Sequence, residues 1–225
     1  QEGKLEESLE FAKKALELAQ SLFDENSETT AALSYNYALN LMDVGQQKES
    51  AREFSKTVKI YTQVFGRDSE SLSSVYFDEG RANARINRRK SERSFERGIN
   101  IIGDIYGTSS LNFADINVQA GIILSEESNL AITERFFEKS LNIYENEFGR
   151  DHLYTALVNF HLGKYHFMNA NVSKSKNFLS NAIVGLESLE SKDDVDQALL
   201  AAARGLFGQL NEVEAVRDEF FPRRH

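Results

Sequence analysis

The sequence predicts an all-α protein built as a solenoid of stacked antiparallel helical hairpins. One short pattern of small and large residues returns along the 225 residues at a nearly constant step of 41 or 42. A fixed period of this length is the signature of repeated units that stack on one another. The chain contains one proline, which suits a mostly helical protein. No alternating β-branched run bounded by turn residues predicts a strand.

The repeat is most visible at a pair of adjacent residues that recurs in each unit, and at two positions that lie at fixed distances from this pair in the sequence. The pairs are Phe23-Asp24, Phe65-Gly66, Tyr106-Gly107, Phe148-Gly149 and Glu190-Ser191. Fourteen positions after the second member of each pair stand the small residues Ala38, Gly80, Gly121, Gly163 and Gly205. Twelve positions before it stand Ala12, Phe54, Phe95, Phe137 and Leu179. The shared phases predict that every unit folds in the same way.

The units are expected to form a single repeat domain over the whole chain, 1–225. A half unit at about 3–24 supplies one unpaired helix, and four full hairpins follow at about 25–66, 67–107, 108–149 and 150–191. A partial unit at about 192–221 is expected to hold a second helix that stops at Pro222. A start and an end within a unit favour a fragment of a longer protein, or ends that another domain caps.

The unit at 150–191 illustrates the two helices of a hairpin. The first helix is expected at about 152–168, the turn at 169–171 and the second helix at about 172–189. In the second helix, Phe178, Leu179, Ile183 and Leu186 follow the spacing of three and four residues that places side chains on one helical face.

Glycines and side-chain oxygens indicate where the helices end and begin. Gly66, Gly107 and Gly149 follow the second helices, where a left-handed residue commonly ends a helix. Side-chain oxygens that are expected to cap the next helix follow at Asp68, Ser109 and Asp151.

The glycines in the middle of helices need a separate reason, because each costs about 1 kcal/mol relative to alanine. Two helices approach closely only where one backbone carries little side chain. We therefore expect Gly80, Gly121, Gly163 and Gly205 to mark the crossing of the two helices within each hairpin.

No motif in the sequence marks a catalytic nucleophile or a metal site. It has no cysteine, and His161 and His166 lie five positions apart, off a common helical face. It contains neither an HExxH motif nor a phosphate-binding glycine loop between a strand and a helix. We predict that the protein is not an enzyme, with no catalytic residue, no metal and no cofactor.

The charge is unevenly distributed. The chain carries a net charge of −9, which disfavours general nucleic-acid binding. The window 81–97 holds seven basic and two acidic residues, a net charge of +5, so the other residues carry −14. This window is interpreted either as a docking site for an acidic partner or as a solvated helix face.

The phase pattern resembles the tetratricopeptide repeat family over about residues 3–221. The step of 42 is similar to the longer kinesin light chain-type repeats, and the segments Phe148-Gly149-Arg150-Asp151 and Phe65-Gly66-Arg67-Asp68 are particularly close to them. The resemblance also places small residues of the second helices at Ser8, Ser50, Ser91, Thr133 and Ser175, and at Ala15, Thr57, Gly98, Ser140 and Ala182. It implies a right-handed superhelix whose concave surface is lined by the first helices.

The resemblance also implies which side chains face that concave surface. The candidate residues for a partner-binding groove are Tyr35, Phe77, Arg81, Arg85, Val118, Ile122, Phe160, Lys164 and Phe167. Such a groove suits a peptide with an aromatic or aliphatic anchor beside acidic residues. For Phe160 and Phe167, packing against the neighbouring hairpin is the alternative. The carboxylate clamp of the chaperone-binding members is absent, because Tyr35, Leu39, Phe77 and Asp78 occupy its places.

Several positions depart from the family pattern. Glu79, Asn83, Asn117 and Asn159 stand where apolar residues are usual. For Glu79 we expect a hydrogen bond between helices or an arginine partner from the next helix, because a buried unpaired carboxylate is costly. The segment 125–129 lacks the usual glycine turn, so a different bend is expected in the third hairpin.

These observations favour a non-catalytic scaffold that binds a protein or peptide partner through the concave groove. A regulatory sensor module, which binds a signal peptide or small ligand and controls an effector domain outside this chain, is the alternative. Self-association through the end hairpins is a third interpretation. No apolar run approaches the roughly 18 residues that a membrane span needs. The compartment stays open between cytoplasm and periplasm.

Overall fold

The computed structural model describes residues 2–127, 131–189 and 193–220, and these residues form helices and turns without a strand. The helices are α1 (Glu2–Leu22), α2 (Glu28–Asp43), α3 (Gln47–Phe65), α4 (Glu70–Asn83), α5 (Arg88–Tyr106), α6 (Leu111–Glu127), α7 (Ala131–Phe148), α8 (Leu153–Met168), α9 (Val172–Ser188) and α10 (Asp194–Phe220). The all-α prediction is confirmed. The chain forms two compact units, Gln1–Phe113 and Ala114–His225.

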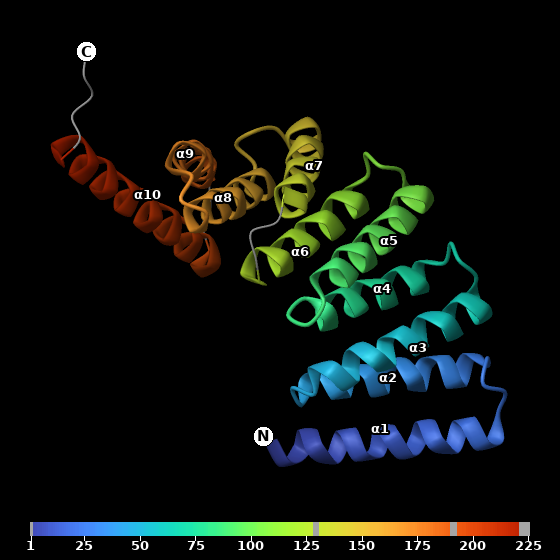
Figure 1. The fold of residues 1–225 in the computed structure, drawn as a ribbon. Coiled ribbons are helices and arrows are strands. Elements are labelled where there is room, and N and C mark those ends of the chain that lie inside the picture. The colour runs from blue at the N-terminus through green and yellow to red at the C-terminus, as the bar shows by residue number, and fades with distance from the viewer. Residues whose placement is uncertain (1, 128–130, 190–192, 221–225) are drawn as a thin grey trace. The chain divides into compact units, whose positions relative to one another are not determined.

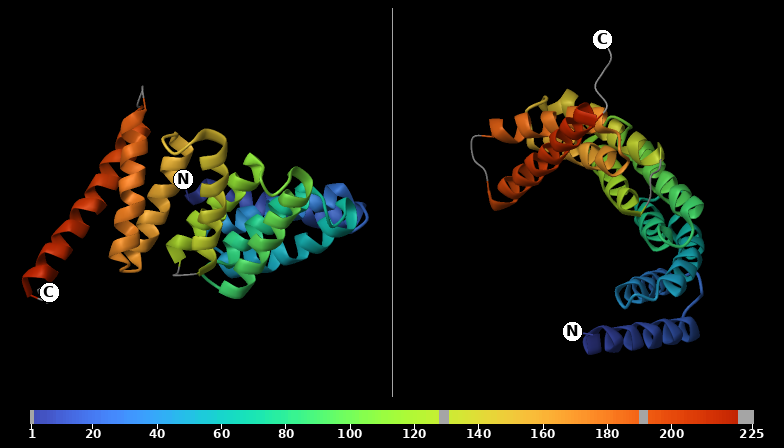
Figure 2. Two further views of the ribbon diagram at one scale, coloured as in Figure 1. Left: turned by 90° about the horizontal axis from the view of Figure 1, so that it is seen from above. Right: turned by 60° about the vertical axis from the view of Figure 1, so that its left-hand side comes forward.

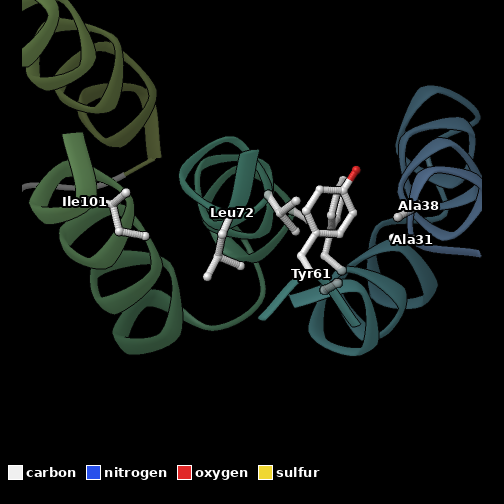
Figure 3. Close-up of a cluster of buried hydrophobic side chains, with 9 residues drawn as sticks. Ala31, Ala38, Tyr61, Leu72 and Ile101 are labelled. Carbon is white, nitrogen blue, oxygen red and sulfur yellow. The ribbon is translucent and has the colours of Figure 1, made fainter. Parts of the chain in front are cut away.

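Unit 1 contains α1 to α5, and each helix packs against the next one in the chain (Figure 1). Apolar side chains from α2, α3, α4 and α5 form one buried cluster. Figure 3 shows Leu72 of α4 between Tyr61 of α3 and Ile101 of α5. Helix α4 is therefore held between the second helices of two successive hairpins.

Unit 2 contains α7, α8, α9 and α10 together with most of α6, and α10 lies beside α9 (Figure 2). The predicted second helix of the fifth unit is wrong, because α10 is one continuous helix from Asp194 to Phe220. Leu199, Leu206, Phe207 and Leu210 repeat at helical spacing and pack on the core of unit 2.

The expected helix crossings are confirmed in three hairpins and wrong in the fifth unit. A Cβ atom on Gly80 would stand 2.9 Å from the ring of Phe95, and one on Gly121 would stand 2.7 Å from the ring of Phe137. A Cβ on Gly163 would meet Leu179 at 2.7 Å. A Cβ on Gly205 would meet nothing within 4 Å, because α10 has no partner helix in its own unit of the repeat.

The small hydroxyl residues of the second helices have a role that the sequence did not reveal. Ser50 donates a hydrogen bond of 2.9 Å to the carbonyl oxygen of Ala38. Ser91 and Ser175 donate 2.8 Å bonds to the carbonyl oxygens of Gly80 and Gly163. In these three hairpins the serine joins the two helices at the small residue of the first helix, whereas Thr133, at the same phase of the third hairpin, has no hydrogen-bond partner for its Oγ1 among the described residues.

The helix ends follow the glycines but not the predicted caps. Gly66, Gly107 and Gly149 have φ angles of 88°, 90° and 87°, as expected. At Gly66 and Gly107 ψ is 170° and 147°, an extended conformation with positive φ that is almost confined to glycine. The N-caps lie one residue later than Asp68, Ser109 and Asp151. The side chains of Ser69, Ser110 and His152 accept amide hydrogens from the first turns of α4, α6 and α8.

Three sequence expectations fall on residues outside the described part. They are the turn after the third unit's first helix, which includes residues 128–130, the phase pair Glu190-Ser191, and the helix stop at Pro222.

Candidate functional site

The predicted groove residues lie on the first helices of the hairpins, as the resemblance implied, with one exception. In unit 1, Tyr35 is on α2, Phe77 and Arg81 are on α4, and Arg85 lies in the turn that follows α4. The residues of unit 2 are on α6 and α8, and they are Val118, Ile122, Phe160, Lys164 and Phe167.

In unit 1 a hydrogen-bond network connects α2 with α4. The hydroxyl of Tyr35 donates a bond of 2.5 Å to Oδ2 of Asp78, and Arg81 Nη1 lies 2.8 Å from Oδ1 of the same carboxylate. Burial, and then the bond to Asp78, raise the pKa of Tyr35 well above its usual range. The ring of Tyr35 packs on Phe54 and Tyr61. Tyr35 is therefore fixed by both its ring and its hydroxyl.

Phe77 and Arg85 complete what we call the α2–α4 face, defined by Tyr35, Phe77, Arg81 and Arg85. The half-buried ring of Phe77 meets the ring of Phe95 edge to face at 5.0 Å. The side chain of Arg81 is 44% exposed, and Arg85 is exposed. The face thus presents aromatic edges on rigid supports beside two solvent-accessible guanidinium groups.

In unit 2 most of the candidate side chains belong to the core. Val118 is 6% exposed and packs with Phe137 and Val158. Ile122 lies half-buried against the same cluster. Phe160 is 9% exposed in a cluster that includes residues of α10, and Phe167 packs against that cluster. For both phenylalanines the structure shows the alternative arrangement, packing against the neighbouring helices.

Lys164 is half-buried and acts on a histidine that the sequence did not single out as functional. The ring of His161 stacks on Phe137 at 5.8 Å and meets Phe160 edge to face at 5.5 Å. Burial, and then the charge of Lys164, lower the pKa of His161 to about 4. The folded protein therefore holds this ring neutral.

Acidification should destabilise the protein through His161. Because the folded pKa is about 4 and the unfolded pKa about 6.5, the unfolded chain binds the extra proton between these values, and stability falls as the pH falls. From about pH 7.5 to about pH 5 we expect a loss of about 2 kcal/mol relative to His161→Phe, measured by urea unfolding. The phenylalanine keeps an aromatic ring on Phe137. Equal losses in both proteins would show that His161 does not titrate in this way.

The expected partner of Glu79 is present, but it is a lysine. Glu79 is 4% exposed, and its Oε1 lies 3.0 Å from Nζ of Lys90 on α5. Ser55 donates to Oε1 at 3.0 Å and Ser94 donates to Oε2 at 2.8 Å. The carboxylate is thus satisfied by α3 and α5, which supports the structural interpretation of this position.

Two of the other unusual polar positions bond to their own helices. Asn83 Nδ2 donates to the carbonyl oxygen of Glu79 at 2.8 Å, and Asn159 Nδ2 donates to that of Thr155 at 3.0 Å. Asn117 is buried. Among the described residues, no group of three or more histidine, aspartate or glutamate side chains is arranged to hold a metal ion. None of the described helices is both long enough and apolar enough to span a bilayer.

Comparison with solved structures identifies the fold. BtubC (BKLC) from P. vanneervenii matches with a TM-score of 0.59 and 14% identity, covering 98% of this chain and 95% of that chain. A putative kinesin light chain from Podosopora anserina with nearly identical TPR-like repeats matches with a TM-score of 0.72 and 12% identity, covering 84% and 90%. A variant of the same protein gives 0.70 and 12%, covering 81% and 87%. No protein-family model and no curated protein matches the sequence. The chain thus has a tetratricopeptide-like repeat fold, as predicted.

Proposed function

We propose that this protein is a non-catalytic scaffold that binds a protein or peptide partner, and that the α2–α4 face of unit 1 is a partner-binding surface. The observation that carries the proposal is the Tyr35–Asp78–Arg81 network, which joins two first helices and fixes an aromatic side chain beside a basic one. Repeat folds of this kind present an extended surface and are common scaffolds for protein interactions.

The chemistry of the face suits a partner with an apolar anchor and acidic residues. Tyrosine and arginine are enriched among the residues that dominate binding energy. The bonds to Asp78 order Tyr35 and Arg81 before a partner arrives, so less conformational entropy is lost on binding. In unit 2, the half-buried Ile122, Lys164 and Phe167 are the candidates for further contacts, and Val118 and Phe160 support them from the core.

The double variant Arg81→Glu/Arg85→Glu should lose the natural partner. Inverting both charges places two carboxylates opposite the acidic residues of the partner, and we expect affinity to fall at least about tenfold. The assay is an affinity pull-down from the native source, followed by calorimetry with the identified partner. The matched control is Lys4→Glu/Lys59→Glu, which makes the same change of charge at two exposed positions of α1 and α3.

The outcome is informative only when helicity and melting are unchanged in both variants. Loss of the partner by the first variant and its retention by the control support the α2–α4 face. Equal recovery by wild type and both variants would place the partner elsewhere on the molecule.

A further inference from the structure

A second surface of unit 1 lies between α3 and α5, and its floor is α4. It contains two cavities of about 280 and 460 Å³. The smaller one lies at the amino-terminal ends of α3 and α5 and is lined by Lys48, Arg52 and Lys90 among others. The larger one lies toward their carboxyl-terminal ends and is lined by Arg67 and Arg97 among others. We call the two cavities together the α3–α5 surface.

This surface is distinct from the α2–α4 face. Leu72 and Tyr76 line the larger cavity, and Asn83 lines the smaller one. At about 100° per residue, these three positions lie on the opposite side of α4 from Phe77 and Arg81. Figure 3 shows this side of α4, where Leu72 lies between α3 and α5.

The α3–α5 surface carries an excess of positive charge, and most of its basic side chains are without an ion pair among the described residues. Lys48, Arg52, Arg67 and Arg97 have no ion pair with any carboxylate of the described residues, and Asp104 is the one acidic residue that lines either cavity. Lys90 is different, because it is paired with the buried Glu79.

In the larger cavity, the position of the Arg97 side chain is fixed by stacking. The guanidinium of Arg97 lies over the ring of Tyr76, with Cζ 5.6 Å from the ring centroid. Tyr76 itself lies half-buried against the core of unit 1. This stacking holds the charged group at the wall of the cavity while leaving its hydrogen-bond donors free to face a ligand.

Unit 2 contains a cavity of about 350 Å³ at the same place in the repeat, and its charges differ. Arg150 stands at the repeat position of Arg67, but Glu145 replaces Thr62 and Asn181 replaces Arg97. Arg150 Nε lies 4.0 Å from Oε1 of Glu145, so the unit 2 arginine has an internal partner. The uncompensated charge is therefore a property of unit 1 and not of the repeat architecture.

We propose that the α3–α5 surface binds an extended acidic peptide segment of a partner protein. One cluster of carboxylates pairs with Arg67 and Arg97, and a second pairs with Lys48 and Arg52. Arginine binds carboxylates through two parallel hydrogen bonds, which gives the larger cavity its preference for them. Along α3 the rise from Arg52 in the smaller cavity to Thr62 in the larger one is about 15 Å, so about five residues of extended peptide connect the two cavities. The overall negative charge of the chain favours a short acidic segment over a long polyanion.

The test uses the full chain and a fluorescein-labelled peptide with two pairs of glutamates separated by four glycines. Binding is followed by fluorescence anisotropy at about 50 mM salt, because salt screens exposed charges. We expect the glutamate peptide to bind and its glutamine counterpart not to bind. Arg67→Glu/Arg97→Glu and Lys48→Glu/Arg52→Glu should each weaken binding at least about tenfold.

Two controls separate this site from the other surfaces. Arg150→Glu in the unit 2 cavity and Arg81→Glu/Arg85→Glu on the α2–α4 face should change the affinity for this peptide less than about twofold. This test does not depend on the proposed function of the α2–α4 face, since the pull-down changes a different set of residues. Either proposal can fail while the other stands.

Four results would overturn the proposal. They are no binding of the glutamate peptide, equal binding of the glutamine peptide, equal weakening by the site variants and the controls, and a preference for phosphatidylserine vesicles that depends on the same arginines. The last result would assign the surface to a membrane and not to a peptide. Circular dichroism and urea unfolding of each variant establish that the fold is intact.

Discussion

Gly121→Val should lower the free energy of unfolding by about 3 kcal/mol, because it forces apart the two helices of the third hairpin. A Cβ atom at this position would stand 2.7 to 2.9 Å from three atoms of the Phe137 ring. Phe137 is fully buried, so it has no free space to move into. Urea unfolding followed by circular dichroism measures the loss, and hydrogen exchange should show it first in α6 and α7.

The matched control is Gly205→Val, which makes the same change at the same phase of the repeat. A Cβ there meets nothing within 4 Å, so we expect stability to stay equal or to rise by up to about 0.5 kcal/mol through better helix propensity. A double-mutant cycle with Phe137→Ala gives the second check. If the two substitutions act through one contact, their effects will fall short of additivity by at least about 1 kcal/mol. Additive effects would contradict a crossing at Gly121.

The same pair of positions shows how much of the fold can be predicted from the sequence. A mid-helix glycine opposite a large apolar residue has one economical explanation, a close helix crossing, and the prediction is confirmed at Gly80, Gly121 and Gly163. It failed at Gly205 because the phase of a residue does not say whether its partner helix exists. The stripe Leu199, Leu206 and Leu210 fits one continuous helix as well as the first helix of a hairpin.

Helix starts were predicted only to within one residue. Asp68, Ser109 and Asp151 share a phase and carry suitable oxygens, but their successors, two serines and a histidine, can also accept an amide hydrogen. In the structure the caps are the later residues, and Ser69 and His152 have the extended φ and ψ of an N-cap. A choice between adjacent capping side chains depends on the path of the preceding loop, which the sequence pattern does not contain.

The candidate site was also predicted only in part. The resemblance placed Tyr35 and Arg81 on first helices, and the structure joins them through Asp78. For Phe160 and Phe167 the sequence left both interpretations open, because inward phase alone does not reveal that residues of α10 pack in the same cluster. Of the α3–α5 surface, the sequence indicated only the basic window 81–97, which contains Lys90 and Arg97. Comparison of Arg97 with Asn181 at one repeat position would also have shown that the charge is confined to one unit.

Lys90→Met should lower the free energy of unfolding by about 3 kcal/mol, since it leaves the carboxylate of Glu79 buried without its counter-ion. The side chain of Glu79 is only 6% exposed, so little water reaches its carboxylate, although the side chain of Lys90 is 35% exposed. Ser55 and Ser94 continue to donate hydrogen bonds, which do not neutralise the charge. Urea unfolding at neutral pH measures the loss. The control is Lys14→Met on α1, which breaks an exposed pair with Glu10 and should cost less than about 0.5 kcal/mol.

The double variant Glu79→Leu/Lys90→Met decides what the buried pair contributes. A buried ion pair gains little over apolar residues of similar volume, whereas a single unpaired charge is strongly unfavourable. We therefore expect the double variant to recover to within about 1 kcal/mol of wild type. Of the two hydroxyls that lose Glu79 as an acceptor, Ser55 can still donate to the carbonyl oxygen of Ala51, which lies 2.7 Å away. If the double variant is instead less stable than Lys90→Met alone, Glu79 stabilises α4 through its serine bonds more than through its charge. The presence of Glu79 at a repeat position that is usually apolar would then be explained by its bonds to the two serines and not by its pairing with Lys90.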